Sequence, residues 1–223
     1  MQNTSGPPRV KICGLTNLAD AQAAAQSGAD YLGFVFIERS ARYVTAAELT
    51  AWWGELPKLA TRVALFQNAT SATVESVLNQ LQVDVLQFHG SESPEFCSQF
   101  GLPYWKSIGF PLGGSAIGES FMDAAERYVE AQALLIDSVT VDASGRKVSG
   151  GTGKQFDWAL WPTWYKDRLV LAGGLQPANI AAAVQALKPW AVDVSSGVEA
   201  SAGKKDPQKL EEFCTAVHYR SSS

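Results

Sequence analysis

The chain has 223 residues, of which 46% are hydrophobic, and its 18 Lys and Arg against 22 Asp and Glu give a net charge of −4. A domain of this size can bury about 70% of the surface that its unfolded chain exposes. The mild acidity and the lack of a basic stripe argue against a nucleic-acid partner. No apolar run reaches the roughly 18 residues that a membrane helix needs, so a membrane role is not expected.

The ends of the chain and its cysteines indicate the cellular setting. Residues 1–8 lack the charged and apolar regions of a signal peptide, and we expect residues 1–9 to form a flexible lead. Residues 10–219 are expected to form one domain, and residues 220–223 to fray. The three cysteines have no metal-ligand spacing, which favours reduced thiols and a cytoplasmic location. No obligate protein partner is evident.

Short apolar runs alternate with helical patterns along the whole chain. The runs predict strands at Val10–Cys13, Tyr31–Phe36, Arg62–Phe66, Val85–His89, Tyr104–Ile108, Ala133–Asp137, Leu169–Ala172 and Ala191–Ser195. Helices are predicted at Asn17–Ser27, Ala46–Leu56, Ser71–Leu81, Glu119–Glu130, Pro177–Leu187 and Pro207–Tyr219, with weaker patterns at Ser93–Phe100 and Asp157–Tyr165. This alternation favours a parallel sheet, and units of about 28 residues suit a single (β/α)₈ TIM barrel. An open doubly wound sheet is the alternative.

Strand parity predicts which side chains point into the barrel. In the first strand, Lys11 and Cys13 share one face, while Val10 and Ile12 share the face that should meet the helices. The last strand should close the barrel beside the first, placing Asp193 near Lys11. A structural ion pair is the favoured interpretation, because a buried lysine needs a partner. The alternative is that the pair sets the field around Cys13 or the substrate. The same parity points further side chains inward: Gln87, His89, Asp137 and Ser195.

Two residues at strand ends suit proton transfer. Cys13 lies before a glycine turn with a cation on its own face, which favours a reactive thiolate over a buried hydrophobe. Asp137 ends an apolar strand, either as a cap or as a functional acid. The polar segment Ser138–Gln155 that follows is predicted to be one loop, of a length typical of lids and binding loops. Its stretch at 150–154 departs from a nucleotide P-loop, because Gln155 stands where Ser or Thr is required.

Glycine-rich turns close the seventh and eighth strands, where barrels of this kind bind phosphate through backbone N–H groups. The residues concerned are Gly173 and Gly174 after one strand, and Ser195, Ser196 and Gly197 after the other. Their paired occurrence predicts a phosphate site.

Further residues are expected to contact a substrate at the mouth of the barrel. Arg42 follows the second strand and could form a bidentate pair with a carboxylate. His89 should line the mouth, and Lys11 and Asp193 complete the expected contacts. Because neither a second histidine nor a carboxylate cluster accompanies His89, no metal site is predicted.

Several short segments match a known family in order along the chain. They are Lys-Ile-Cys-Gly-Leu-Thr (11–16), Gly-Phe-Val-Phe (33–36), Arg-Tyr-Val (42–44), Gln-Phe-His-Gly (87–90), Leu-Leu-Ile-Asp (134–137), Gly-Gly-Thr-Gly-Lys (150–154), Phe-Asp-Trp (156–158), Ala-Gly-Gly-Leu (172–175) and Asp-Val-Ser-Ser-Gly-Val-Glu (193–199). In these segments the chain resembles the phosphoribosylanthranilate isomerases of tryptophan biosynthesis. The departures are few: Ala41 replaces a frequent proline, Phe88 replaces leucine, and the segment after Asp137 is longer than in compact relatives.

The resemblance implies an Amadori rearrangement of N-(5-phosphoribosyl)anthranilate to an aminodeoxyribulose phosphate, without a cofactor. It implies Cys13 as general base, Asp137 as general acid and Arg42 as the contact for the anthranilate carboxylate. The expected partner is thus a small phosphorylated sugar–anthranilate. One alternative is a sister isomerase of histidine biosynthesis, or an enzyme serving both pathways, although that chemistry uses an aspartate where this chain has Cys13. Another is a catalytically silent phosphate-binding barrel, which the retention of Cys13 and Asp137 disfavours.

Overall fold

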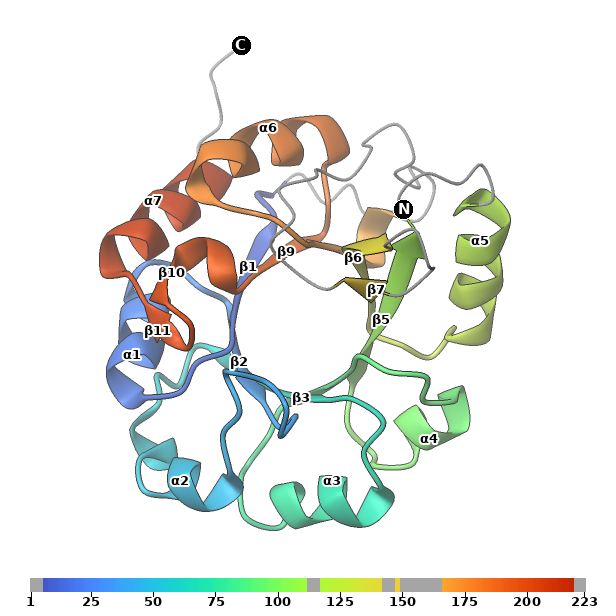
Figure 1. The fold of residues 1–223 in the computed structure, drawn as a ribbon, viewed down its shortest axis with the longest axis horizontal. Helices are drawn as coiled ribbons and strands as arrows, with labels where there is room; N and C mark the ends of the chain where they lie inside the picture. The colour runs from blue at the N-terminus through green and yellow to red at the C-terminus, as the bar shows by residue number, and fades with distance from the viewer. Residues whose placement is uncertain (1–5, 112–116, 142–146, 149–165, 219–223) are drawn as a thin grey trace.

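A closed ring of parallel strands forms the centre of the protein (Figure 1). The computed structural model describes residues 6–111, 117–141, 147–148 and 166–218. The ring strands are β1 Arg9–Cys13, β2 Tyr31–Val35, β3 Thr61–Phe66, β4 Val85–Phe88, β5 Tyr104–Pro111, β6 Ala133–Val141, β8 Leu169–Ala172 and β9 Ala191–Val194. Each pairs in parallel with the next, and β1 pairs with both β2 and β9. The predicted (β/α)₈ barrel is therefore confirmed, and the open-sheet alternative is wrong.

Helices surround this ring on its outside (Figure 1). They are α1 Leu18–Gln26, α2 Ala46–Thr50, α3 Ser71–Leu78, α4 Pro94–Ser98, α5 Ile117–Arg127, α6 Pro177–Leu187 and α7 Pro207–His218. The predicted helix at 46–56 ends early and continues as the 3-10 turn η1 Trp53–Glu55. The helix predicted at 157–165 lies outside the described residues. None of the helices in the described part is long and apolar enough to cross a membrane.

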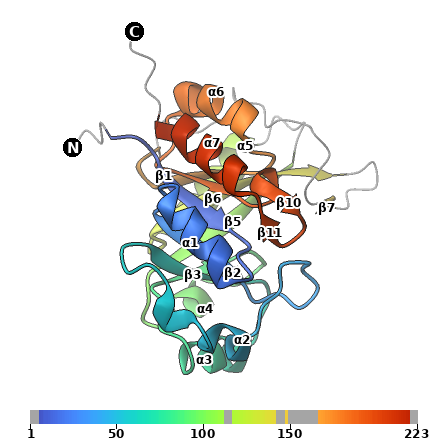
Figure 2. The same ribbon diagram turned by 90° about the vertical axis from the view of Figure 1, so that its left-hand side faces the viewer.

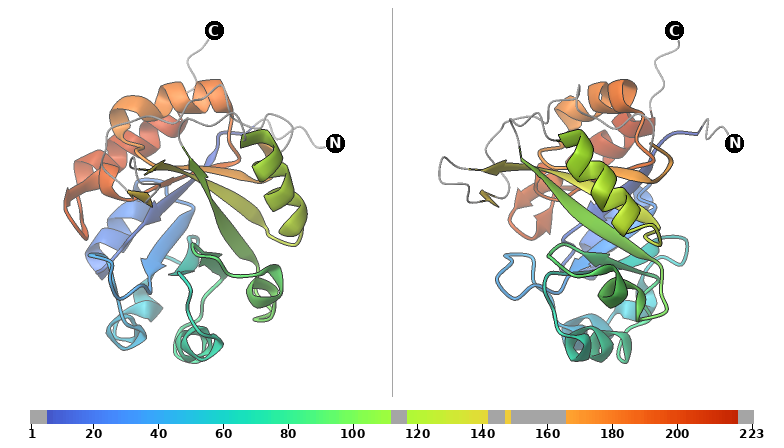
Figure 3. Two further views of the ribbon diagram at one scale, coloured as in Figure 1. Left: turned by 45° about the vertical axis from the view of Figure 1, so that its right-hand side comes forward. Right: turned by 90° about the vertical axis from the view of Figure 1, so that its right-hand side faces the viewer.

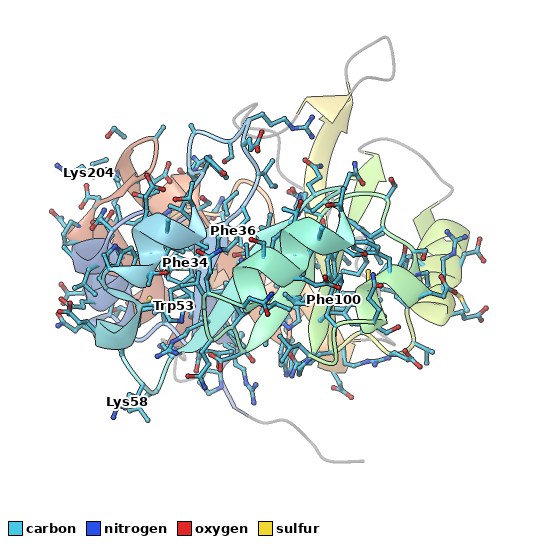
Figure 4. All side chains as sticks on the ribbon, turned by 90° about the horizontal axis from the view of Figure 1, so that it is seen from below. Phe34, Phe36, Trp53, Lys58, Phe100 and Lys204 are labelled. Carbon is cyan, nitrogen blue, oxygen red and sulfur yellow. The ribbon has the colours of Figure 1, made fainter. Side chains whose placement is uncertain are left out.

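The core has two parts, as the alternation of strand residues predicts. Outside the ring, Val10 and Ile12 are fully buried with the apolar faces of the helices. Aromatic side chains belong to this layer, including Phe34 against Trp53 at 4.9 Å between ring centroids (Figure 4). Inside the ring, Trp105 meets Tyr31 edge to face, in a cluster with small and branched residues. The inward and outward faces predicted for the first strand are confirmed.

Two hairpins extend the barrel at the carboxyl ends of its strands (Figures 2 and 3). In the first, β6 continues past Asp137 and pairs antiparallel with β7 Lys147–Val148. The prediction of one loop over 138–155 was therefore wrong at its start, where the run Val139–Val141 favours a strand. In the second, β10 Glu199–Ser201 pairs with β11 Lys204–Lys205. Figure 4 shows Lys204 of this hairpin far from Lys58, which lies towards the opposite end of the barrel.

Candidate active site

Cys13 ends β1 inside the barrel, with 6% of its surface exposed and its thiol free. The side chain of Lys11, one inward position earlier, is fully buried, and its Nζ lies 2.9 Å from Oδ1 of Asp193. Lys11 and Asp193 are direct partners in the register of β1 and β9. The predicted ion pair is therefore confirmed. Whether it also acts on the substrate stays a prediction.

Burial governs the protonation of the Cys13 thiol. It raises the pKa of Cys13 and outweighs Lys11 and Lys205, which lower this pKa, while Asp193 raises it further. Burial also lowers the pKa of Lys11, but Asp193 and Cys13 outweigh it and hold that pKa above its usual value. The site thus favours a neutral thiol beside a charged lysine, and the thiolate predicted from the adjacent cation is not the favoured form. Once deprotonated, such a thiol is a stronger base.

The space for Cys13 is provided by Gly33, its partner in the register of β1 and β2. A Cβ atom at Gly33 would lie 3.1 Å from each of three atoms: Cys13 Cα, Cys13 Sγ and Lys11 Cε. This contact is closer than ordinary van der Waals packing allows. Glycine at this position therefore sets the room available to the Cys13 side chain.

Asp137 lies on β6, and its carboxylate approaches the histidine that follows β4. The Asp137 Oδ2 is 3.5 Å from Nε2 of His89, and about a quarter of each side chain is exposed. His89 Nδ1 is buried and has no hydrogen-bond partner among the described residues, and neither has the amide of Gln87. In the ring, β1 and β6 are separated by β8 and β9 on one side and by β2 to β5 on the other. Cys13 and Asp137 therefore belong to well-separated strands of one mouth.

A buried ion pair fixes the segment that carries His89. Lys106 Nζ donates to the carbonyl of Gly90 at 2.6 Å and lies 3.3 Å from Oε2 of Glu92. Glu92 in turn accepts from the backbone N–H groups of Gly90 and Asn68, at 2.9 and 2.7 Å. Neither Lys106 nor Glu92 belongs to a functional motif in the sequence, so this support could not be predicted from it.

The two predicted phosphate loops touch each other. Gly173 and Gly174 have φ values of 85° and 63°, which favour glycine. At Gly197 a Cβ atom would overlap the carbonyl oxygen of Leu175, so only glycine lets the loops meet. In the described part of the chain, the backbone N–H groups of Gly174, Ser196 and Gly197 are paired with no acceptor. The buried hydroxyl of Ser195 is likewise unpaired. Free N–H groups on adjoining loops suit an anion.

Arg42 reaches over the turn after β1, where a Cβ atom at Gly14 would overlap the Arg42 side chain. Its Nε and Nη2 donate to the two carboxylate oxygens of Glu199, both at 2.7 Å. The hydrogen bonds to Glu199 outweigh burial and raise the pKa of Arg42. Glu199 also accepts from Lys205 at 3.0 Å. Neither Glu199 nor Lys205 was predicted from the sequence as a site residue. Glu199 is nevertheless the last residue of the family segment at 193–199.

The remaining cysteines lie away from the mouth. Cys97 on α4 and Cys214 on α7 are fully buried, and burial raises the pKa of both to about 12. Their predicted packing role is consistent with these positions. Within the described ranges, no group of three or more His, Cys, Asp or Glu side chains could hold a metal ion.

The model of the N-(5′-phosphoribosyl)anthranilate (PRA) isomerase family matches residues 10–216. The N-(5′-phosphoribosyl)anthranilate isomerase of Acidithiobacillus ferrooxidans is 45% identical over 209 residues, covering 94% of this chain and 97% of that protein. The enzyme of the same name from Thiobacillus denitrificans is 44% identical over 205 residues, covering 92% and 95%.

Solved structures agree with this match. Phosphoribosyl anthranilate isomerase from Thermotoga maritima superposes with a TM-score of 0.80 at 38% identity, covering 94% of this chain and 98% of that chain. A phosphoribosyl anthranilate isomerase in complex with reduced 1-(o-carboxyphenylamino)-1-deoxyribulose 5-phosphate gives 0.78 at 36% identity, with the same coverage. The chain belongs to the N-(5′-phosphoribosyl)anthranilate isomerase family.

Proposed function

We propose that the chain converts N-(5-phosphoribosyl)anthranilate to 1-(2-carboxyphenylamino)-1-deoxyribulose 5-phosphate in tryptophan biosynthesis. Family membership gives the reaction. The observation that supports the assignment to residues is that four groups lie at the carboxyl ends of the ring strands. These are the Cys13 thiol, the Asp137 carboxylate, the Arg42 guanidinium and the free N–H groups of the two glycine loops.

Asp137 is the proposed acid and Cys13 the proposed base. Asp137 gives a proton to the ring oxygen of the ribose while the anthranilate nitrogen lone pair forms a C1=N double bond and the C1–O bond breaks. The iminium then acidifies C2. The fraction of Cys13 that has released its proton to solvent acts as the thiolate base and removes the C2 proton, so that the electrons move into a C1–C2 enolamine. Return of a proton to C1 and loss of the C2 hydroxyl proton give the ketone. Acid and base on different strands suit this two-sided proton transfer.

Both ends of the substrate are anionic, and the mouth offers a contact for each. The phosphate would accept from the N–H groups of Gly174, Ser196 and Gly197, while the anthranilate carboxylate would pair with Arg42. Anchoring at two points holds C1 and C2 between acid and base, which supplies part of the rate enhancement as orientation. His89, Lys11 and Asp193 are proposed to contact the sugar between these anchors.

The alternatives are less well supported by the residues present. A sister isomerase of histidine biosynthesis would need an aspartate where β1 ends in Cys13. A silent phosphate-binding barrel would have no use for both Cys13 and Asp137. We further propose a small-molecule partner only and a cytoplasmic location, which suits the three free and buried cysteines.

A fluorescence assay tests this function directly. The purified chain is given N-(5-phosphoribosyl)anthranilate, and loss of the substrate signal is followed with and without a chelator. The proposal expects turnover at the same rate in both, with product formation confirmed by mass. A parallel assay with the aminoaldose substrate of histidine biosynthesis separates the two pathways. Turnover of that substrate alone, or of neither, would overturn the proposal.

A further inference from the structure

The ammonium group of Lys205 joins three parts of the mouth. Lys205 belongs to β11, and its side chain is fully buried. Its Nζ donates to the carbonyl of Cys13 at 2.6 Å, to the carbonyl of Ser195 at 3.1 Å and to Oε1 of Glu199 at 3.0 Å. An ammonium has three hydrogens, so these acceptors use all of them. The Lys205 ammonium is therefore fixed in position and orientation.

Two of these acceptors lie where the pairing of the first and last ring strands stops. The register of β1 with β9 ends at Ile12 opposite Val194. The next carbonyl along the chain after each of these residues, from Cys13 and from Ser195, accepts from Lys205 instead. Lys205 thus continues the junction of the two strands by one residue, and it does so beside the proposed base and the proposed phosphate loop.

The third acceptor, the carboxylate of Glu199, links Lys205 to Arg42. Burial raises the pKa of Glu199, but hydrogen bonds and charges of Arg42 and Lys205 outweigh it and hold that pKa below its usual range, so Glu199 is ionised. Only 5% of its side chain is exposed. The Glu199 carboxylate accepts hydrogen bonds from Nε and Nη2, along one edge of the Arg42 guanidinium. A bidentate pair of this kind fixes the plane of the guanidinium as well as its position.

Arg42 keeps an edge for a ligand. A guanidinium has five N–H donors, and Glu199 takes two of them. Among the described residues no acceptor takes the others, and a quarter of the side chain is exposed. Because Arg42 and Lys205 are cationic and Glu199 is anionic, the three groups together carry a single positive charge. The cluster therefore presents both free donors and net positive charge for an anion.

We propose that Glu199, fixed by Lys205, is a positioning residue that presents the free edge of Arg42 to the substrate carboxylate. This inference rests on the proposed function, in which Arg42 binds the anthranilate. A planar carboxylate gains two parallel hydrogen bonds only when the guanidinium plane is aligned with it. A guanidinium already held in plane loses less conformational freedom on binding, so preorganisation increases affinity for the carboxylate specifically.

Two probes that differ only in the carboxylate test the proposal. One is reduced 1-(o-carboxyphenylamino)-1-deoxyribulose 5-phosphate, and the other is its analogue built from aniline. Calorimetry with wild type should show tighter binding of the carboxylated probe. Glu199→Gln should weaken that probe by about tenfold and leave the aniline analogue within about twofold, since only the carboxylate contact is aligned by Glu199. Glu199→Asp keeps the charge but shortens the side chain by one methylene, which disturbs the bidentate contact with Arg42, and it should show the same selective loss.

Each other outcome counts against the proposal. If both probes weaken equally in the Glu199 variants, Glu199 only supports the fold. If the carboxylated probe binds as well or better, Glu199 competes for Arg42 rather than presenting it. Lys205→Met should also reduce the preference for the carboxylated probe, and an unchanged preference would overturn the role of Lys205. If wild type has no preference, or Arg42→Ala keeps it, the assignment of Arg42 in the proposed function fails. A preference lost in Arg42→Ala but kept in Glu199→Gln overturns the further inference alone.

Discussion

Adding one methyl group at Gly33 should impair catalysis through the position of Cys13. The Cβ atom of Gly33→Ala would lie 3.1 Å from Cys13 Sγ and from Lys11 Cε, where ordinary contacts are 3.4–4 Å. The neighbours must therefore give way by a few tenths of an ångström. Cys13 is only 6% exposed and Lys11 is fully buried, so moving into solvent does little to relieve the strain.

The cost can be divided between stability and rate. Overpacking of this kind costs about 1–3 kcal/mol, which lowers the melting temperature of a chain of this length by about 2–12 °C. Because a misplacement of about 1 Å can cost a hundredfold in rate, a shift of a few tenths should lower kcat by roughly three- to tenfold. The KM should change little, since neither anchor is touched.

Steady-state kinetics and thermal unfolding of Gly33→Ala measure both effects. The matched control is Gly54→Ala, where a Cβ atom meets nothing within 4 Å. The control should retain wild-type kcat. If Gly33→Ala matches the control in both kcat and melting temperature, the tight placement of Cys13 is not what the reaction depends on.

Three further results are expected. Burial raises the pKa of Cys97 and Cys214 to about 12, above an ordinary value of 9.0, so their contribution to the free energy of unfolding is complete below pH 9.0 and is lost as pH rises towards 12. Chemical denaturation between about pH 8 and 11 should show this decline, and a shallower decline in the double alanine variant; equal slopes would contradict it. Gly174→Val should raise KM and weaken phosphate inhibition about tenfold, whereas Gly101→Val, at a similar φ and also in open space, should change neither. Arg42→Ala should lose on the order of 2–4 kcal/mol of transition-state binding, and kcat/KM within a factor of two of wild type would reject its role.

The barrel could be predicted because each strand repeats one simple pattern. Apolar residues such as Val10 and Ile12 alternate with the unusual inward pair Lys11 and Cys13, and a period of two fixes their faces. Because a closed ring places the last strand beside the first, the proximity of Asp193 to Lys11 could be predicted from the same pattern. The prediction failed after Asp137, where strand-forming residues are embedded in a polar, glycine-rich segment and their pairing partner, β7, comes later in the same segment.

The site was predictable where a reactive side chain ends a strand, as Cys13 and Asp137 do. The support from Lys205 was not, because its burial depends on the β10–β11 hairpin folding back beside β1. Nothing in two adjacent lysines tells which one is exposed and which one is fully buried. The role of Gly33 was hidden for a related reason, since its contact with Cys13 follows from the strand register.

The most direct test of the acid–base assignment is the turnover of Cys13→Ser and Asp137→Asn. Both variants remove a proton-transfer group while keeping its approximate size, and general acid–base catalysis contributes about 10² to 10⁴ in rate. We therefore predict that each variant loses about 10² to 10⁴ in kcat. The far-ultraviolet circular dichroism spectrum and the binding of reduced 1-(o-carboxyphenylamino)-1-deoxyribulose 5-phosphate should stay close to wild type. A folded Cys13→Ser enzyme with near-wild-type kcat would contradict the account, and His89 would become the next base to examine.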